Sequence, residues 1–227
     1  MSRPKHKLLL STLLSFLMIP AVNAACQTAL EESGEWFTNR RQPPAKVMDA
    51  IGVKEGMVIG EVGAGHGRYT VQLAARVGPS GKIFAEDINA ASVDHLRERC
   101  AKDGIKNIEV ILGEVTDPLF PEASLDMVFM VLTYHHLSEP VALLKNLTPS
   151  LKSGATVVVI DPDPVKDKGN PSSEYTSKEE IEREAGEAGF ELVRVETFLE
   201  RDNIFILRLK QTQGFPQFVT TPLVVNF

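Results

Sequence analysis

The chain has 227 residues, of which 24 are Lys or Arg and 30 are Asp or Glu, giving a formal net charge of −6. This length suits one domain with a single core, and the acidic balance argues against a nucleic-acid substrate, because binding to phosphates depends on Lys and Arg. The two cysteines, Cys26 and Cys100, allow at most one disulfide and lack metal-ligand spacing, so no metal site is predicted.

Residues 1–24 have the layout of a secretory signal peptide. A basic start precedes a mostly apolar stretch at 8–19, and small residues at 22–24 suit cleavage. Such a stretch is too short to cross a hydrocarbon core of about 30 Å as a helix, so no permanent membrane span is predicted. We expect cleavage after Ala24 and export to the periplasm or beyond. Lipid attachment at Cys26 and an uncleaved tether are the alternatives.

The stretch 57–70 joins a short apolar strand to a glycine-rich turn. Gly63, Gly65 and Gly67 stand at alternate positions and leave a bend without side chains, and a helix is predicted to begin soon after them. A ligand can therefore approach the backbone closely, beside the positive end of that helix. Glu61 at the strand tip would repel a pyrophosphate but suits a ligand that carries an ammonium group.

The pattern Glu61-x-Gly63-x-Gly65-x-Gly67 resembles the first motif of the class I S-adenosylmethionine-dependent methyltransferases. The resemblance implies that these residues and Ala64 bind S-adenosylmethionine. It also implies an amino-terminal lid or linker before the catalytic domain. The fold implied is α/β, with a Rossmann-like seven-stranded mostly parallel sheet, helices on both faces and an antiparallel last strand.

A second strand is predicted at 81–87, and it ends in two acidic residues. Asp87 follows Gly67 by 20 residues, the spacing at which a carboxylate accepts hydrogen bonds from ribose hydroxyls in related dinucleotide sites. Because successive strand residues point to opposite faces, we expect only one of Glu86 and Asp87 to face the ligand, and we assign Asp87. The resemblance adds Ile88 to the cofactor site.

A third strand is predicted at 107–112, followed by two further candidates for the cofactor site. The resemblance implies that Glu114 reaches the adenine amino group and that Val115 lies against the ring. A charged loop residue that merely follows a strand is the alternative for Glu114.

The apolar run 125–132 lacks alternation, as expected for a parallel strand that is buried on both faces. Ligands in open α/β sheets bind outside the carboxyl ends of the strands, so Tyr134 and His135 are placed for substrate contact. The family that the chain resembles lines its active site with this segment. For the neighbouring His136 we favour a structural role.

A helix between Pro140 and Leu151, with Gly154 after its end, leads to a fifth strand at 155–160. Asp161 ends that strand at the same edge, where it would orient or deprotonate a nucleophile. Asp-Pro pairs equally begin turns, so a structural role is the alternative.

Alternating helices and strands predict a parallel sheet covered on both faces. Ser177 and Glu180 form a capping box at the start of a further helix. Two strands follow, at 190–196 and 203–210, and the link between them is too short for a parallel crossover, so they must pair antiparallel.

We divide the chain into the signal peptide, a lid or linker at 25–45, a methyltransferase domain at 46–210 and a tail at 211–227 without an assigned role. The expected activity is methyl transfer from S-adenosylmethionine to an unidentified small-molecule or protein acceptor. The catalytic candidates are Tyr134, His135 and Asp161.

Two alternatives to this activity are a noncatalytic binding module and a nicotinamide-dependent reductase, which the glycine spacing disfavours. Export conflicts with a cofactor that is made in the cytoplasm. The sequence does not fix the oligomeric state.

Overall fold

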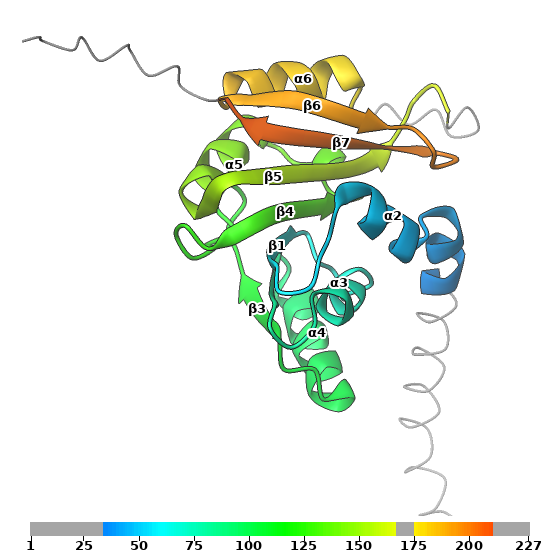
Figure 1. Cartoon of the computed structure of the whole chain (residues 1–227), viewed down its shortest axis with the longest axis vertical. Helices are drawn as coiled ribbons and strands as arrows, with labels where there is room; N and C mark the ends of the chain where they lie inside the picture. The colour runs from blue at the N-terminus through cyan, green and yellow to red at the C-terminus, as the bar shows by residue number, and fades with distance from the viewer. Residues whose placement is uncertain (1–33, 167–174, 211–227) are drawn as a thin grey trace, which may run out of the picture. The chain divides into compact units, whose positions relative to one another are not determined.

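The computed structural model of the protein describes residues 34–166 and 175–210 (Figure 1). The predicted signal peptide, Cys26 and the tail at 211–227 lie outside the described residues. The chain divides into two units, Met1–Gly52 and Val53–Phe227. Among the described residues, no helix is both long enough and apolar enough to cross a membrane.

The described part of the first unit is helical. Residues 34–41 form one helix, and α2 (Pro44–Ile51) follows it. The Trp36 and Phe37 rings meet edge to face, and the Arg40 guanidinium lies over the Trp36 ring. The role of this segment as a lid remains a prediction.

The second unit is built on a seven-stranded sheet, in the order β3-β2-β1-β4-β5-β7-β6 (Figure 1). The strands are β1 (Val58–Val62), β2 (Lys82–Asp87), β3 (Ile108–Leu112), β4 (Leu125–Val131), β5 (Leu151–Pro162), β6 (Phe190–Glu196) and β7 (Asp202–Leu209). Strands β1 to β5 pair in parallel, whereas β7 runs antiparallel to both β5 and β6. The predicted fold class is confirmed.

Helices flank the sheet on both faces. They are α3 (Thr70–Val77), α4 (Ala90–Asp103), α5 (Pro140–Leu147) and α6 (Lys178–Glu187). Leucines of α5 and Ile181 of α6 share one buried cluster with Val62, Phe84 and Val128 of the sheet, while α3 and α4 pack against β2 and β3. Both faces of the central strands are therefore covered, which explains why β4 is apolar without alternation.

Local signals in the sequence set the helix ends. The Asn89 side chain accepts hydrogen bonds from the N–H groups of Ala91 and Ser92 at the start of α4. The predicted capping box is present at the start of α6, where the Ser177 hydroxyl and the Glu180 carboxylate each accept the other residue's backbone N–H. These bonds satisfy N–H groups that the first turn of a helix leaves without partners.

The connection into β5 differs from the prediction. Helix α5 ends at Leu147, a 3-10 turn (Thr148–Ser150) follows, and β5 already begins at Leu151. Gly154 therefore lies inside the strand, with a φ of 81°, where the register between β4 and β5 shifts. A glycine at a strand irregularity resembles a helix end in the sequence, because both positions need a backbone conformation that other residues avoid.

Candidate cofactor-binding and catalytic site

The three glycines after β1 all adopt left-handed backbone conformations, but they serve different purposes. A side chain at Gly63 would place its Cβ 2.5 Å from the Thr133 hydroxyl, and one at Gly67 would overlap Leu96. Among the described residues, no atom lies within 4 Å of the corresponding position at Gly65. Two glycines thus let the loop pack on the protein, and Gly65 alone opens to empty space.

Asp87 holds this loop in place from the end of β2. One carboxylate oxygen accepts the Gly65 N–H at 2.8 Å, and the other accepts the Asn89 N–H at 2.8 Å. A carboxylate has about four lone-pair sites, so Asp87 keeps the capacity to accept two further hydrogen bonds.

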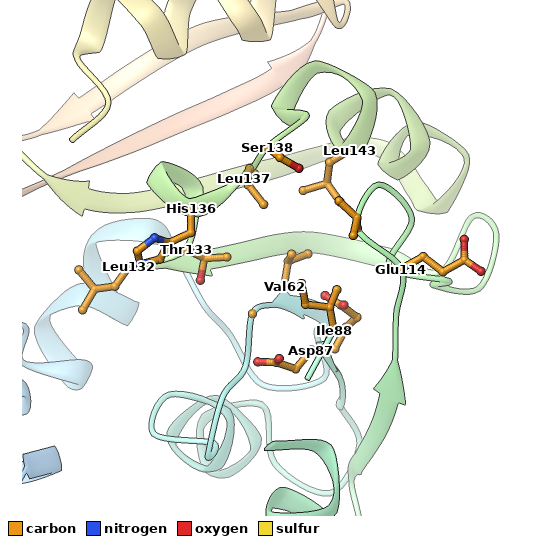
Figure 2. Close-up of a pocket in the computed structure, with 13 residues that line it drawn as sticks. Val62, Asp87, Ile88, Glu114, Leu132, Thr133, His136, Leu137, Ser138 and Leu143 are labelled. Carbon is orange, nitrogen blue, oxygen red and sulfur yellow. The ribbon is translucent and has the colours of Figure 1, made fainter. Parts of the chain in front are cut away.

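A pocket of about 390 Å³ lies at the carboxyl ends of the strands (Figure 2). Five of the predicted cofactor residues line it: Gly63, Asp87, Ile88, Glu114 and Val115. Glu114 is exposed, and its side chain extends away from the other labelled residues (Figure 2). Apolar residues from other elements, such as Leu137 and Leu143, complete the lining. The pocket therefore combines apolar walls with acidic groups.

Four predicted cofactor residues lie outside that lining: Glu61, Ala64, Gly65 and Gly67. Glu61 is 1% exposed, and one of its carboxyl oxygens has no hydrogen-bond partner among the described residues. Burial raises the pKa of Glu61 to about 7, and the charge of Asp87 adds to this, while Thr70 and Arg68 oppose it. The structure places this carboxyl inside the protein, near Thr70 at the start of α3.

Glu86 is a pocket residue that the sequence analysis did not assign. It is 2% exposed and lines the pocket together with Asp87, so both acids, and not Asp87 alone, border the pocket. Strand alternation does put the two side chains on opposite faces, but the pocket extends over the end of β2 and reaches both. Gly113 is the signal in the sequence, because a side chain there would collide with the Glu86 carboxyl.

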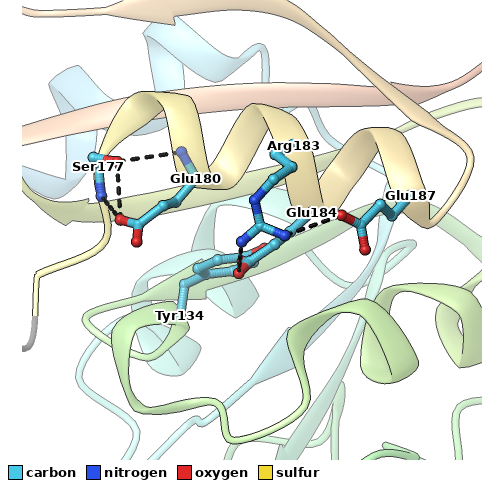
Figure 3. Close-up of polar contacts among 6 residues, drawn as sticks. All are labelled: Tyr134, Ser177, Glu180, Arg183, Glu184 and Glu187. Atoms are coloured by element: carbon cyan, nitrogen blue, oxygen red, sulfur yellow. Dashed lines mark hydrogen bonds and ion pairs between the residues drawn. The ribbon is translucent and has the colours of Figure 1, made fainter.

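Tyr134 lies outside the pocket lining, although the sequence made it a catalytic candidate. It is 2% exposed, and its hydroxyl donates a hydrogen bond to the Glu184 carboxylate of α6 at 2.9 Å (Figure 3). Burial and the charge of Glu184 both raise the Tyr134 pKa. This placement favours a positioning role, in which Tyr134 anchors the turn that carries the histidines.

Removal of the Tyr134 hydroxyl tests that anchor. We expect Tyr134→Phe to lower the free energy of unfolding by about 1.5–3 kcal/mol, the range for a hydrogen bond to a charged group. Urea denaturation measures this loss. In a Glu184→Gln background the same change is expected to cost less, because the two residues are coupled. Equal costs in both backgrounds would show that the negative charge of Glu184 adds nothing to the bond, because the Gln oxygen can still accept it.

His135 and Asp161 form a hydrogen-bonded pair beside the pocket. Asp161 is fully buried, and one of its oxygens accepts the His135 backbone N–H at 2.8 Å, while the other lies 3.1 Å from the ring Nδ1. An ionised carboxylate only accepts hydrogen bonds, so it keeps the proton on Nδ1 and makes Nε2 the basic nitrogen. The pair is thus a candidate base, which lies outside the pocket lining but next to the pocket residue His136.

His136 lies in the pocket lining, although the sequence favoured a structural role, and its role stays a prediction. It lines the pocket, and its ring lies 3.9 Å from that of His135, measured between centroids. Leu132, just before this turn, has a φ of 54°. Such strain in a residue other than glycine persists where the surroundings enforce it, and it is common at functional sites. Within the described residues, no group of three His, Cys, Asp or Glu side chains is arranged to hold a metal ion.

Comparisons with known proteins identify relatives of this chain in both sequence and fold. A family profile described as a methyltransferase domain matches residues 59–154. The solved structure of an S-adenosylmethionine-dependent methyltransferase from Aquifex aeolicus is 34% identical, covers 72% of this chain and 88% of its own, and superposes with a TM-score of 0.68.

Two curated relatives match over shorter stretches. A demethylmenaquinone methyltransferase from Lactococcus lactis is 29% identical over 52% of this chain and 46% of its own length. A nocamycin O-methyltransferase from Saccharothrix syringae is 32% identical over 37% of this chain and 30% of its own. The chain thus spans less than half the length of these relatives. The glycine loop, the sheet topology and the match to the Aquifex structure show that the chain belongs to the class I S-adenosylmethionine-dependent methyltransferase family.

Proposed function

We propose that this chain binds S-adenosylmethionine in the pocket at the ends of β1, β2 and β4 and transfers its methyl group to a small molecule. The observation that carries the proposal is the open backbone at Gly65, held by Asp87 next to a pocket with apolar walls. A backbone free of side chains admits a ligand at close range, and the spare acceptor sites on Asp87 suit ribose hydroxyls.

The residues around the pocket fit each part of such a ligand. Ile88 and Val115 offer apolar contacts for a purine, and Glu114 stands at the rim, within the region that the family resemblance assigns to adenine. When bound, S-adenosylmethionine supplies a methyl group that its sulfonium already activates. The protein then needs mainly to hold the acceptor in line, and such positioning is worth several kcal/mol.

His135 and Asp161 are the proposed base for an acceptor that must lose a proton. With Nδ1 fixed by Asp161, Nε2 of His135 takes the proton from a hydroxyl, and the buried carboxylate stabilises the resulting imidazolium. The relatives named for demethylmenaquinone and nocamycin support a small-molecule acceptor. Tyr134 acts by holding the turn rather than by touching substrate.

Calorimetry with S-adenosylhomocysteine on the purified protein tests the cofactor assignment. We expect binding to the wild type, and a loss of about 10- to 100-fold in Asp87→Ala, which removes hydrogen bonds to a charged group. Asp94→Ala, an exposed acid on α4, is the matched control and should bind normally. Binding of NADH alone would overturn the proposal and favour a reductase.

A labelled methyl donor separates an enzyme from a binding module. Cell extracts incubated with the protein and the isotopically labelled donor are expected to contain a newly labelled small molecule, detected by mass spectrometry. Tight binding of S-adenosylhomocysteine without transfer to any extract component would support a noncatalytic module instead.

Export is the second part of the proposal. It is supported by the basic and apolar pattern of residues 1–24, which lie outside the described residues. Fractionation of cells that express the full chain, with sequencing of the mature amino terminus, is expected to find the protein outside the cytoplasm and cleaved after Ala24. An uncleaved cytoplasmic protein would contradict export.

A further inference from the structure

We propose that Glu86 is an additional cofactor-binding residue, which donates a hydrogen bond from a protonated carboxyl to an acceptor atom of the adenosyl group. The inference rests on the proposed function, because it concerns the same pocket. Neither the family resemblance nor the strand pattern assigns Glu86 to the site.

The position of the Glu86 carboxyl carries the first step. The side chain is 2% exposed and lines the pocket, and its Oε1 has no hydrogen-bond partner among the described residues. The carboxyl fills the space beside Gly113 and accepts a backbone hydrogen bond from Gly63. A buried polar atom without a partner is destabilising, so a ligand group that pairs with Oε1 removes that cost.

The surroundings of Glu86 point to the adenosyl group. Phe84, two residues earlier on β2, belongs to the buried cluster that also contains Val62 and Leu143, and strand alternation puts Glu86 on that same face. Val62 and Leu143 also line the pocket. The carboxyl therefore adjoins an apolar wall that suits a flat purine, whereas Asp87 is bonded to the glycine loop at Gly65.

The charge state of Glu86 decides whether it donates. Burial raises its pKa to about 8, the negative charge of Asp87 adds to this, and the bond from Gly63 opposes it. The other titratable groups that line the pocket are Glu114 and His136. At neutral pH the carboxyl is therefore mostly protonated, and its O–H is a donor for ring nitrogens or ribose oxygens.

The pH dependence of binding tests the proposal independently of catalysis. The protonated form is present below the pKa and is lost as the pH rises through about 8. We expect the dissociation constant of S-adenosylhomocysteine for the wild type to rise about tenfold between pH 7 and pH 9. Glu86→Gln keeps a donor that does not titrate, so it should bind within about threefold of the wild type at pH 7 and lose this rise.

Glu86→Ala removes the donor altogether. We expect it to weaken binding of S-adenosylhomocysteine at pH 7 by about tenfold, and its dissociation constant should not rise further at pH 9. 5′-Methylthioadenosine lacks the amino-acid part of the ligand. If the contact is with the adenosyl group, Glu86→Ala should weaken binding of 5′-methylthioadenosine by the same factor. An unchanged affinity for 5′-methylthioadenosine would overturn the assignment to that group.

The failures of the two proposals are distinguishable. A wild type that does not bind S-adenosylhomocysteine contradicts the proposed function. A wild type that binds it, loses binding in Asp87→Ala and keeps it in both Glu86 variants contradicts only the role of Glu86. If Glu86→Ala does not fold, Glu86→Gln alone decides the matter. If its dissociation constant rises between pH 7 and pH 9 as much as that of the wild type, Glu86 is excluded as the titrating donor.

Discussion

Gly63→Ala is expected to weaken binding of S-adenosylhomocysteine by about 10- to 100-fold and to destabilise the protein. The new methyl group would lie 2.5 Å from the Thr133 hydroxyl, at a backbone φ of 72°. A left-handed conformation costs about 1–2 kcal/mol for a residue with a side chain, and overpacking about 1–3 kcal/mol. Because Thr133 lines the pocket, its displacement changes the binding surface directly. Calorimetry and urea denaturation measure the two losses.

Two variants control for the general strain of an alanine in this loop. Gly65→Ala shares the left-handed conformation, but its new methyl group meets no atom of the described residues within 4 Å. It should therefore weaken ligand binding, because the methyl group occupies space that the ligand needs, and it should cost little packing stability. The double variant Gly63→Ala with Thr133→Ala lacks the Thr133 methyl and hydroxyl groups that the new methyl group would overlap. Part of the lost stability should therefore return. A Gly63→Ala protein that binds as well as the wild type would contradict the role of this close approach.

Asp161→Asn is expected to reduce kcat by about 10²-fold or more for an acceptor that must be deprotonated, the usual contribution of general-base catalysis. The amide would turn a donor toward Nδ1 of His135 and move the proton to Nε2, which removes the base. Affinity for S-adenosylhomocysteine should stay within about threefold, because Asp161 does not line the pocket. Steady-state kinetics with the labelled acceptor measures kcat, and its pH profile should lose the limb due to the histidine.

Neighbouring variants separate this effect from a general disturbance of β5. Asp163→Asn alters a carboxylate that bonds to Asn203 and to the backbone of Val165, and it should leave kcat nearly unchanged. His135→Gln should match Asp161→Asn, and the double variant should be no slower than either single one, since the two residues act as a unit. A full rate in Asp161→Asn would show that the acceptor needs no base from this pair.

Much of the sheet was predictable because local and tertiary preferences agree. The apolar runs of β1 and β4, the glycines after β1 and the short link before β7 each select one conformation, and the structure confirms the parallel sheet with an antiparallel end. The irregular entry of β5 was not predictable, because Gly154 satisfies the rules for a helix end as well as those for a strand irregularity.

The site was less predictable than the fold, because side-chain directions at the strand ends depend on the turns. Tyr134 and His136 belong to a 3-10 turn, in which neither strand alternation nor the α-helical period applies, so their directions could not be deduced. Spacing alone located Asp87. The spacing of residues could not reveal Glu86. Its place in the pocket depends on Gly113 after β3, where the lack of a side chain leaves room for a buried carboxyl.

The insertion of β7 between β5 and β6 has a consequence for biosynthesis. Among the described strands, β6 pairs only with β7, and the outer edge of β5 has no partner strand until Asp202–Leu209 has been made. Bare strand edges recruit other chains. A translation product that stops before Asp202 would thus emerge from the ribosome with an apolar edge ready for self-association, and completion of the final strand both docks β6 and removes that hazard.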